Sequence, residues 1–468
     1  MFISDWIEFW ARCQPLHPAV VTPERVITYS VLANAIGSVR ARIDTFGLDK
    51  SAPVAVFIDH PAKMLAVGLA LVRSGYIAVP VSQSSLGHLK AAGISTVLAV
   101  EGGTPRELRR IQVEDDWLTG PAPARETDDT GRRQAIFFTS GSTGVPKAPI
   151  FDFLAQSQWS LYYSSLVAGI SWSRVIVRPG LGSGFGFRSS CMALMQGRTA
   201  CYANSPAAVF GLLSTFRAEL IIASTQQAAD LINYDDRSPG PLDSLQAIWV
   251  GGALLHRELL AQLRAKLCRR VISAYASTEG SIAAFAPDMY AVESIPGAVG
   301  YVAPWAQIEV VDSEDRVLRP GAEGIVRYRT EVHAKTLRSG AGTQDWFYPG
   351  DVGAVTAEGI VCIYGRTDDR LNLGGVKSSA ESLDFRLCGL PEVKDGAVCA
   401  LPDARGVDVL CVAVVPARSC DKETFRLRLA SEIFKLPVER VDFVNSIPRT
   451  AEGKVMRNEL RATLRESS

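Results

Sequence analysis

The sequence predicts an α/β fold, in which a large N-terminal domain of helix-covered mixed sheets carries a small barrel-like β layer and a small α+β domain follows. Three observations lead to this prediction. Strand-like and helix-like segments alternate from residue 27 to about 277, short strands between Gly, Pro and Asp turns fill residues 295–365, and a second α+β pattern ends the chain. We therefore expect domains at residues 1–367 and 368–468.

The composition is typical of a globular protein and not of a disordered or fibrous chain. Its 468 residues are 47% hydrophobic and 21% charged, with 49 basic and 49 acidic side chains. Because the net charge is zero, no global field attracts nucleic acid or an anionic membrane. Asp5 and Glu8 interrupt the apolar N-terminus, which is typical of an amphipathic helix. No uncharged run reaches the roughly 18–20 residues of a membrane span, so we expect neither nucleic acid nor a membrane span.

The nine cysteines form no C-x-x-C pair and match no metal site. Reduced thiols in a cytoplasmic protein are the interpretation that this pattern favours.

The first half of the chain alternates as a helix-covered, mostly parallel sheet would. Residues 27–43 have helical spacing, residues 52–58 are a strand-type run, and residues 64–82 indicate a buried helix, a Gly turn and another strand. Residues 101–134 are charged and rich in Pro and Gly, which predicts surface chain, and residues 134–138 predict a strand.

The same pattern continues to residue 276, and different patterns follow. We expect strands at 175–177, 199–203, 219–224, 245–250 and 270–276, with helices at 207–216 and 256–267. Strands at 306–312, 323–330 and 359–366 predict an antiparallel layer. In the last part we expect strands at 393–401, 407–416 and 440–447 and helices at 422–434 and 458–466.

The segment FFTSGSTGVPKAPI (137–150) has the composition of a phosphate-binding loop. Glycines let backbone N–H groups converge on an anion, hydroxyls add donors, and a lysine adds charge. It does not match the Walker A pattern, because Pro146 precedes Lys147 where glycine is required and Ala148 follows where a hydroxyl is required. By itself it is equally compatible with a polar surface loop.

Together with five later segments in order, this loop resembles the signature of the adenylate-forming superfamily, which includes acyl- and aryl-CoA synthetases, adenylation domains of peptide synthetases, and luciferases. The later segments are VGGALL (250–255), AYASTEG (274–280), WFYPGDVG (346–353), YGRTDDRLNLGGVKSSAESLD (364–384) and PRTAEGKVMRNELR (448–461). The resemblance covers nearly the whole chain and is closest in type to a bacterial-style acyl- or aryl-CoA synthetase. It implies that the C-terminal domain is mobile.

The resemblance implies a two-step reaction. A carboxylate attacks the α-phosphorus of ATP to give acyl-AMP and pyrophosphate, and a thiol then displaces AMP to form a thioester. Lys454 would be the cation between the substrate carboxylate and the α-phosphate, Thr278 would donate to that phosphate, and Glu279 would be the Mg²⁺ ligand. Without the resemblance, Ser277-Thr278-Glu279 could also be the capped start of an ordinary helix, and Lys454 could be a solvated lysine on an ordinary polar turn.

The resemblance also assigns residues to the nucleotide. Tyr275 would stack on adenine, Asp351 would accept from the ribose hydroxyls, and Arg366 would support them. The remaining nucleotide-binding candidates are Thr139, Ser140, Gly141, Ser142, Thr143, Gly144, Lys147, Gly251, Gly252, Ala253, Ala274, Ala276 and Ser277.

The thiol step involves other residues by the same resemblance. Asp368 matches the hinge about which the small domain rotates between the two half-reactions. Gly375 would line the pantetheine tunnel, and Lys377 lies where relatives often place a basic residue for phosphate. The expected cofactors are thus ATP, Mg²⁺ and CoA, or the phosphopantetheine of a carrier protein.

Two departures bear on the substrate. The segment 178–190 has no histidine where many acyl- and aryl-CoA synthetases have one, and no aspartate that would grip an α-amino group is evident. Ala276 replaces the usual glycine, and acetyl-specific relatives have tryptophan there. The predicted acyl pocket consists of small residues with an aromatic wall, namely Gly182, Gly184, Phe185, Ala223, Trp249, Ala276 and Ala283. We expect an aryl or medium-chain acid, although the small residues could instead serve packing.

Three functions remain open at this point. The first is an acyl- or aryl-CoA ligase, and the second is an enzyme that loads an acyl carrier protein. The third is a non-catalytic homologue acting as a binding protein, which the presence of Lys454, Glu279, Thr278, Asp351 and Arg366 disfavours.

Overall fold

A computed structural model describes residues 2–100, 104–120, 134–138, 148–234, 242–255, 257–330, 335–336, 346–367, 370–373, 376–403, 406–417, 421–449 and 455–466. The chain divides into two compact units. Unit 1 comprises Met1–Ser294, Val299–Gln307 and Tyr328–Phe347, and unit 2 comprises Ile295–Ala298, Ile308–Arg327 and Tyr348–Ser468. The predicted domain boundary at 367/368 stays a prediction.

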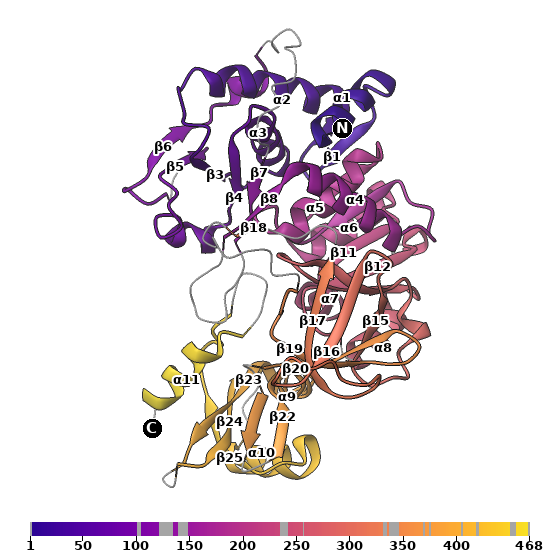
Figure 1. Cartoon of the computed structure of the whole chain (residues 1–468), viewed down its shortest axis with the longest axis vertical. Helices are drawn as coiled ribbons and strands as arrows, with labels where there is room; N and C mark the ends of the chain where they lie inside the picture. The colour runs from indigo at the N-terminus through magenta and orange to yellow at the C-terminus, as the bar shows by residue number, and fades with distance from the viewer. Residues whose placement is uncertain are drawn as a thin grey trace. The chain divides into compact units, whose positions relative to one another are not determined.

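Unit 1 contains two mixed sheets. The first sheet has the order β15-β14-β13-β12-β11-β9-β10-β1-β2, with parallel pairing from β13 to β1 and antiparallel pairing at β14, β15 and β2. The second sheet has the order β18-β8-β7-β4-β3-β5-β6 and is parallel except for β8 and β18. Helices accompany these strands (Figure 1), so the predicted helix-covered mixed sheets are confirmed.

The strands of the first sheet are β1 (Pro18–Val21), β2 (Val26–Thr28), β9 (Arg174–Val177), β10 (Thr199–Tyr202), β11 (Leu220–Ser224), β12 (Ala247–Gly251), β13 (Val271–Ser277), β14 (Ser281–Ala286) and β15 (Ala298–Val302). Those of the second sheet are β3 (Pro53–Phe57), β4 (Ile77–Pro80), β5 (Thr96–Ala99), β6 (Arg109–Gln112), β7 (Gln134–Ile136), β8 (Pro149–Asp152) and β18 (Lys335–Thr336). The helices are α1 (Ile3–Cys13), α2 (Tyr29–Asp44), α3 (Pro61–Arg73), α4 (Phe153–Leu166), α5 (Gly184–Met195), α6 (Pro206–Phe216), α7 (Thr225–Ile232) and α8 (Arg257–Lys266).

Local sequence explains where the helices of unit 1 begin. The Thr28 hydroxyl accepts from the Val31 N–H at 3.4 Å and starts α2, and His60 Nδ1 accepts from the Lys63 N–H at 3.5 Å ahead of Pro61 in α3. Helix α3 is apolar on nearly every side and is buried almost throughout, next to α2 (Figure 1). These helices supply much of the core of unit 1.

In the described part, 104–120, the surface prediction for residues 101–134 is correct for the charged side chains, which are exposed, and wrong for the apolar ones. Residues Arg109–Gln112 form the edge strand β6, and Leu108, Ile111 and Val113 are buried. Trp117 is 4% exposed and stacks on Phe46 with ring centroids 5.3 Å apart. The charged residues of this segment alternate with apolar ones, and the apolar side chains cover the edge of the sheet.

Unit 2 carries the antiparallel layer that the sequence predicts. The strands β16 (Ala306–Val311), β17 (Gly324–Thr330), β19 (Asp351–Val355) and β20 (Ile360–Arg366) lie in that order, and β19 pairs antiparallel with both β17 and β20. Its other strands are β21 (Arg370–Leu373), β22 (Val376–Ser379), β23 (Val393–Pro402), β24 (Asp408–Pro416) and β25 (Val438–Phe443).

The α+β part of unit 2 also matches the prediction, with one difference. Helices α9 (Ala380–Cys388), α10 (Lys422–Arg428) and α11 (Arg457–Glu466) accompany the three-stranded sheet β23-β24-β25. The expected single helix at 422–434 changes after Arg428 into a π-helical turn, Leu429–Phe434, which ends at Lys435 with a positive φ of 56° ahead of Pro437. Both Leu429 and Phe434 are buried, and the wider turn lets both join the core.

Two further observations concern the environment of the chain. Within the described residues, none of the helices is both long enough and apolar enough to cross a membrane. Eight cysteines lie in these residues, and all of them are free thiols.

Candidate active site

Two predicted site residues of unit 1, Gly251 and Ala274, lie side by side at one edge of the first sheet. Ser224, Gly251 and Ala274 are register partners on the neighbouring strands β11, β12 and β13. These strands are parallel, so their carboxyl ends lie at the same edge, where open α/β sheets bind ligands. The structure thus brings together segments that are far apart in the sequence.

The turn after β12 depends on glycine. Gly252 has a φ of +92°, a conformation that side chains disfavour, and Gly252 and Ala253 are exposed. The Ala253 carbonyl accepts from the Thr225 hydroxyl at 3.2 Å, which ties this turn to the start of α7. The backbone at Gly251–Ala253 is therefore fixed in place but open to a ligand.

An aromatic pair borders the same edge. The rings of Phe185 and Trp249 meet edge to face with centroids 5.5 Å apart, and a Cβ added at Gly251 would lie 3.3 Å from Phe185 Cζ. A Cβ at Gly184 would lie 3.2 Å from the Thr278 methyl group. Gly184 therefore lies beside Thr278, and Phe185, Trp249 and Gly251 lie beside one another.

The turn between β13 and β14 carries Thr278 and Glu279, both half-buried. The Ser277 hydroxyl accepts from the Gly280 N–H at 2.7 Å and closes the turn. Tyr275 lies just before it and meets Tyr328 edge to face at 6.0 Å. These residues form a hairpin turn, so the alternative of a capped helix start at Ser-Thr-Glu is wrong.

Arg188 is a residue of this region that the sequence analysis missed. It lies on α5, is 2% exposed, and directs both terminal nitrogens toward the Thr278 carbonyl oxygen at 3.4 and 3.5 Å. Burial lowers its pKa to about 10, while the nearby Tyr163 and Glu279 favour its charged form. It is the single charged residue between Arg178 and Arg198, and that isolation was the available signal.

Asp351 and Arg366 lie together in unit 2. Asp351 is 8% exposed, and Arg366 Nη1 lies 3.4 Å from its Oδ1 while Nη2 donates to the Pro349 carbonyl at 3.0 Å. Gly350, with a φ of +83°, makes the turn ahead of Asp351. Arg366 and Asp351 are therefore neighbours within this unit, and their predicted roles at the ribose hydroxyls stay predictions.

The remaining small residues of the predicted pocket differ in exposure. Ala223 and Ala283 are fully buried within β11 and β14, whereas Ala276 on β13 is exposed. Gly182 packs tightly, because a Cβ there would lie 2.7 Å from the Ser82 nitrogen. Packing thus accounts for part of this set, and its assignment to an acyl pocket stays a prediction.

Several candidates lie outside the described residues. They are the loop Thr139, Ser140, Gly141, Ser142, Thr143, Gly144 and Lys147, the hinge residue Asp368, the tunnel residue Gly375, and Lys454; the side chain of Lys377 is also outside them.

The residues present are compatible with magnesium and ATP. No group of three or more His, Cys, Asp or Glu side chains suited to a metal occurs in the described ranges. Mg²⁺ commonly binds through one or two carboxylates plus substrate phosphates, and the single half-buried Glu279 matches that donor set.

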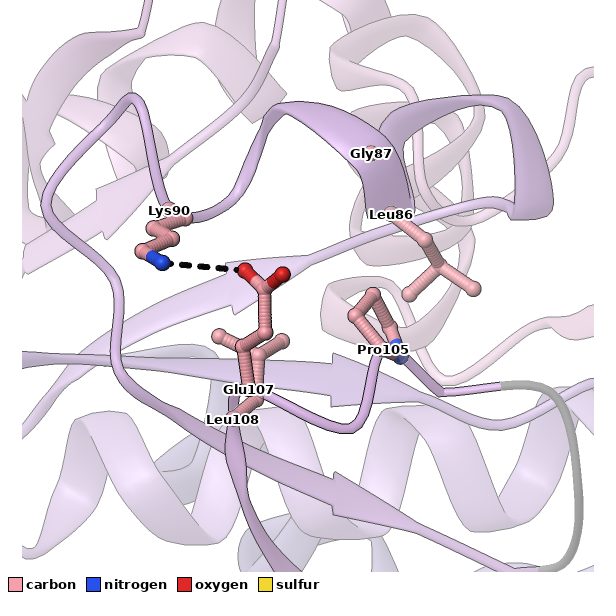
Figure 2. Close-up of a pocket in the computed structure, with 6 residues that line it drawn as sticks. All are labelled: Leu86, Gly87, Lys90, Pro105, Glu107 and Leu108. Carbon is pink, nitrogen blue, oxygen red and sulfur yellow. Dashed lines mark hydrogen bonds and ion pairs between the residues drawn. The ribbon is translucent and has the colours of Figure 1, made fainter.

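A surface hollow in the second sheet of unit 1 is separate from these residues (Figure 2). Leu86, Gly87, Lys90, Pro105, Glu107 and Leu108 line it. Lys90 and Glu107 form an ion pair at 3.1 Å with side chains 74% and 63% exposed, so the pair contributes little stability. Among the predicted site residues that the structure describes, none lines this hollow.

Comparison with known proteins identifies the class. Residues 7–336 match the family described as AMP-binding enzyme, and the chain belongs to this adenylate-forming family. It is similar to the indoleacetate–CoA ligase of Aromatoleum aromaticum (25% identical, 98% of each chain) and to ScoC, a fatty acid–[acyl-carrier-protein] ligase of Streptomyces coeruleorubidus (27% identical, 97% of this chain and 94% of that one). The fold matches o-succinylbenzoate CoA synthetase (MenE) from Bacillus subtilis in complex with its acyl-adenylate, with a TM-score of 0.83 at 20% identity over 97% of each chain.

The family confirms the central sequence predictions. The chain is an enzyme of the AMP-forming acid–thiol ligase class with an ATP-binding adenylate-forming fold. The identity of the acid and of the thiol acceptor goes beyond what family membership decides.

Proposed function

We propose that this chain activates a small aryl or medium-chain carboxylic acid as an acyl-adenylate and transfers the acyl group to the thiol of CoA. The observation that carries the proposal is the alignment of Gly251 and Ala274 with Ser224 at one sheet edge, bordered by the half-buried ring of Phe185, against which the buried Trp249 packs. Backbone groups of an exposed glycine turn and an apolar wall suit a nucleotide joined to an apolar acyl group. We place the reaction in the cytoplasm, where thiols such as the eight described here stay reduced.

The residues have separate tasks in this proposal. Thr278 donates to the α-phosphate, Tyr275 stacks on adenine, and Asp351, held by Arg366, accepts from the ribose hydroxyls. Glu279 would hold Mg²⁺, which when bound offsets the negative charge of the phosphates. Lys454 would supply the cation between the acid and the α-phosphate, where charge develops as the carboxylate oxygen bonds to phosphorus and pyrophosphate leaves.

A panel of acids in ATP–pyrophosphate exchange, with and without CoA, tests the proposal. Aryl acids and medium-chain fatty acids should support exchange, and CoA should draw the acyl-adenylate on to a thioester that mass spectrometry detects. Acetate as the best substrate would contradict the proposed pocket. If none of the acids supports ATP–pyrophosphate exchange, the hypothesis of a non-catalytic homologue that acts as a binding protein gains support.

The acceptor has one specific competitor. The relative ScoC is named as a ligase for an acyl carrier protein, which supports carrier loading as the second candidate. This alternative would be favoured if an acid supports ATP–pyrophosphate exchange and its acyl group is transferred to a carrier protein but not to CoA.

We predict that Lys454→Ala lowers the rate of ATP–pyrophosphate exchange by about 100-fold to 1,000-fold, the usual loss for one group that stabilises developing charge. Thioester formation from supplied acyl-AMP should largely survive, because that step does not need the cation beside the α-phosphate. Lys147→Ala is the matched comparison and should impair exchange less. Equal losses in both half-reactions, or a greater loss for Lys147→Ala, would contradict the assigned role.

A further inference from the structure

The turn that carries Thr278 and Glu279 has a strained backbone. Ser281, which pairs with Ser277 across the turn, has a φ of +73° although it is not glycine, and it is fully buried. Such a conformation persists only where surrounding contacts hold it. The contacts that hold this turn therefore decide where the Thr278 and Glu279 side chains lie.

Side chains from other elements donate hydrogen bonds to the turn. The Tyr328 hydroxyl donates to the Ser277 hydroxyl at 2.8 Å, and the Thr330 hydroxyl donates to the Gly280 carbonyl at 2.9 Å. Both lie in the last three residues of β17, which belong to unit 1. Arg188 of α5 donates to the Thr278 carbonyl at 3.4 and 3.5 Å, and it is the one charged donor among the three.

Arg188 lies in an unusual place for a cation. Its guanidinium carbon is 3.4 Å from the ring centroid of Trp159, 4.5 Å from that of Phe151 and 5.5 Å from that of Phe137. Burying a guanidinium is unfavourable unless partners compensate, and a hydrophobic residue of similar volume at such a site is often as stable or more so. Stability alone therefore gives a weak reason for arginine at this position.

We infer that Arg188 is a positioning residue that, from an aromatic cage, holds the Thr278 carbonyl and thereby fixes the Thr278–Glu279 turn for the adenylation step. The inference rests on the proposed function. The geometry joins α5, which borders the predicted acyl pocket through Gly184 and Phe185, to the turn that bears the proposed phosphate and magnesium ligands. Arg188 itself is too buried to touch substrate.

The direct test compares Arg188→Met with Arg198→Met. Arg198 also stacks on a tryptophan, 4.0 Å from the ring centroid of Trp172, but it makes none of the contacts to the turn described above, so it controls for loss of an arginine–tryptophan contact. We expect Arg188→Met to speed hydrogen exchange of amides in residues 277–281 by about tenfold without any ligand, as for loss of a charge-assisted hydrogen bond. Arg198→Met should leave these amides unchanged.

The kinetic test follows from the same inference. In Arg188→Met the Mg²⁺ concentration at half-maximal pyrophosphate exchange should rise by about tenfold, while the melting temperature stays within a few degrees of the wild type. Arg188→Lys should recover part of the loss, because it restores a cation without the fork of two donors. A fall in melting temperature with unchanged exchange and unchanged Mg²⁺ dependence would overturn the inference and make Arg188 merely structural.

A second variant keeps the inference testable if Arg188→Met does not fold. Gly184→Ala places a methyl group 3.2 Å from the Thr278 methyl and 3.3 Å from Arg188 Nη1, so it should also raise the Mg²⁺ requirement. Unchanged hydrogen exchange and Mg²⁺ dependence in this variant would count against the inference. If the wild type is inactive with every acid, the proposed function is contradicted. Hydrogen exchange of the turn amides needs no activity, so it tests the role of Arg188 independently.

Discussion

At the scale of one residue, the glycine at position 182 has two possible explanations, close packing and ligand binding. Its neighbours are backbone atoms, which cannot rotate away: a Cβ would lie 2.7 Å from the Ser82 nitrogen and 2.8 Å from the Val81 carbonyl carbon. The segment before α5 thus approaches the carboxyl end of β4 more closely than any residue with a side chain allows. The sequence suggested a pocket glycine, and the structure offers a reason in packing.

We predict that Gly182→Ala destabilises unit 1 by about 1–3 kcal/mol, the usual loss on overpacking. Urea unfolding followed by tryptophan fluorescence measures this effect. Gly180→Ala is the matched control in the same segment, because its Cβ would meet no atom within 4 Å. Unchanged stability with an altered preference among acids would instead support a pocket role for Gly182.

Arg188 marks the limit of sequence reasoning at this scale. Motif resemblance pointed to Thr278 and Glu279, since the turn itself carries the pattern. The side chains that hold the turn come from residues 188, 328 and 330, and only the folded chain brings them together. A lone arginine in an otherwise uncharged apolar helix was visible, but its burial depends on the aromatic residues Phe137, Phe151 and Trp159 from other segments.

At the scale of elements, helix α3 begins at a titratable cap. Burial, aided by the charges of Lys63 and Arg25, lowers the pKa of His60 below its usual 6.5, although Glu24 acts in the opposite direction. Because the folded pKa is the lower one, the unfolded chain takes up the proton first as the pH falls. The contribution of the neutral His60 side chain to folding stability is therefore complete above pH 6.5 and is lost as the pH falls through the folded pKa.

We predict that the wild type loses more melting temperature between pH 7.5 and pH 5.5 than His60→Asn does, because asparagine caps the helix without titrating. Thermal unfolding at the two pH values checks this. His60→Ala should be less stable than His60→Asn at both, by about 1 kcal/mol. Equal pH dependence in the wild type and His60→Asn would show that another group dominates.

Most strands and helices could be predicted because their periodicity is local. Helix α8 and strands β11, β12 and β13 lie where the pattern places them. The segment 104–120 could not be predicted, because its apolar residues are few and their burial depends on α2 and β5 as partners. The π-helical turn at Leu429–Phe434 could not be predicted for a similar reason, because it depends on the packing of Leu429 and Phe434 in the core of unit 2.

At the scale of the whole molecule, the two units can be observed separately. All eight tryptophans lie in unit 1, so fluorescence reports that unit alone. In unit 2, Arg457 is 5% exposed. Its Nη2 donates to Asp384 Oδ2 at 2.6 Å, and its Nη1 donates to the Val398 carbonyl at 2.8 Å. This pair joins α9, β23 and the start of α11.

We predict that Asp384→Asn lowers the stability of unit 2 by about 3–5 kcal/mol, because it leaves the buried Arg457 without its counter-charge. Far-UV circular dichroism should show an earlier transition, while the fluorescence transition of unit 1 stays in place. Glu432→Gln, at an exposed position of the π-helical turn, is the control and should change neither. Identical shifts in both signals would mean that the units unfold together.

The pairing of β18 with β8 has a consequence for synthesis on the ribosome. Lys335 and Thr336 pair with Ile150 and Pro149 at the end of the second sheet, whereas the other strands of that sheet are complete by Asp152. A nascent chain therefore carries an open edge at β8 until residue 335 has left the exit tunnel. Open edges favour pairing between chains, so prematurely terminated products ending between residues 152 and 335 are the ones most prone to aggregate.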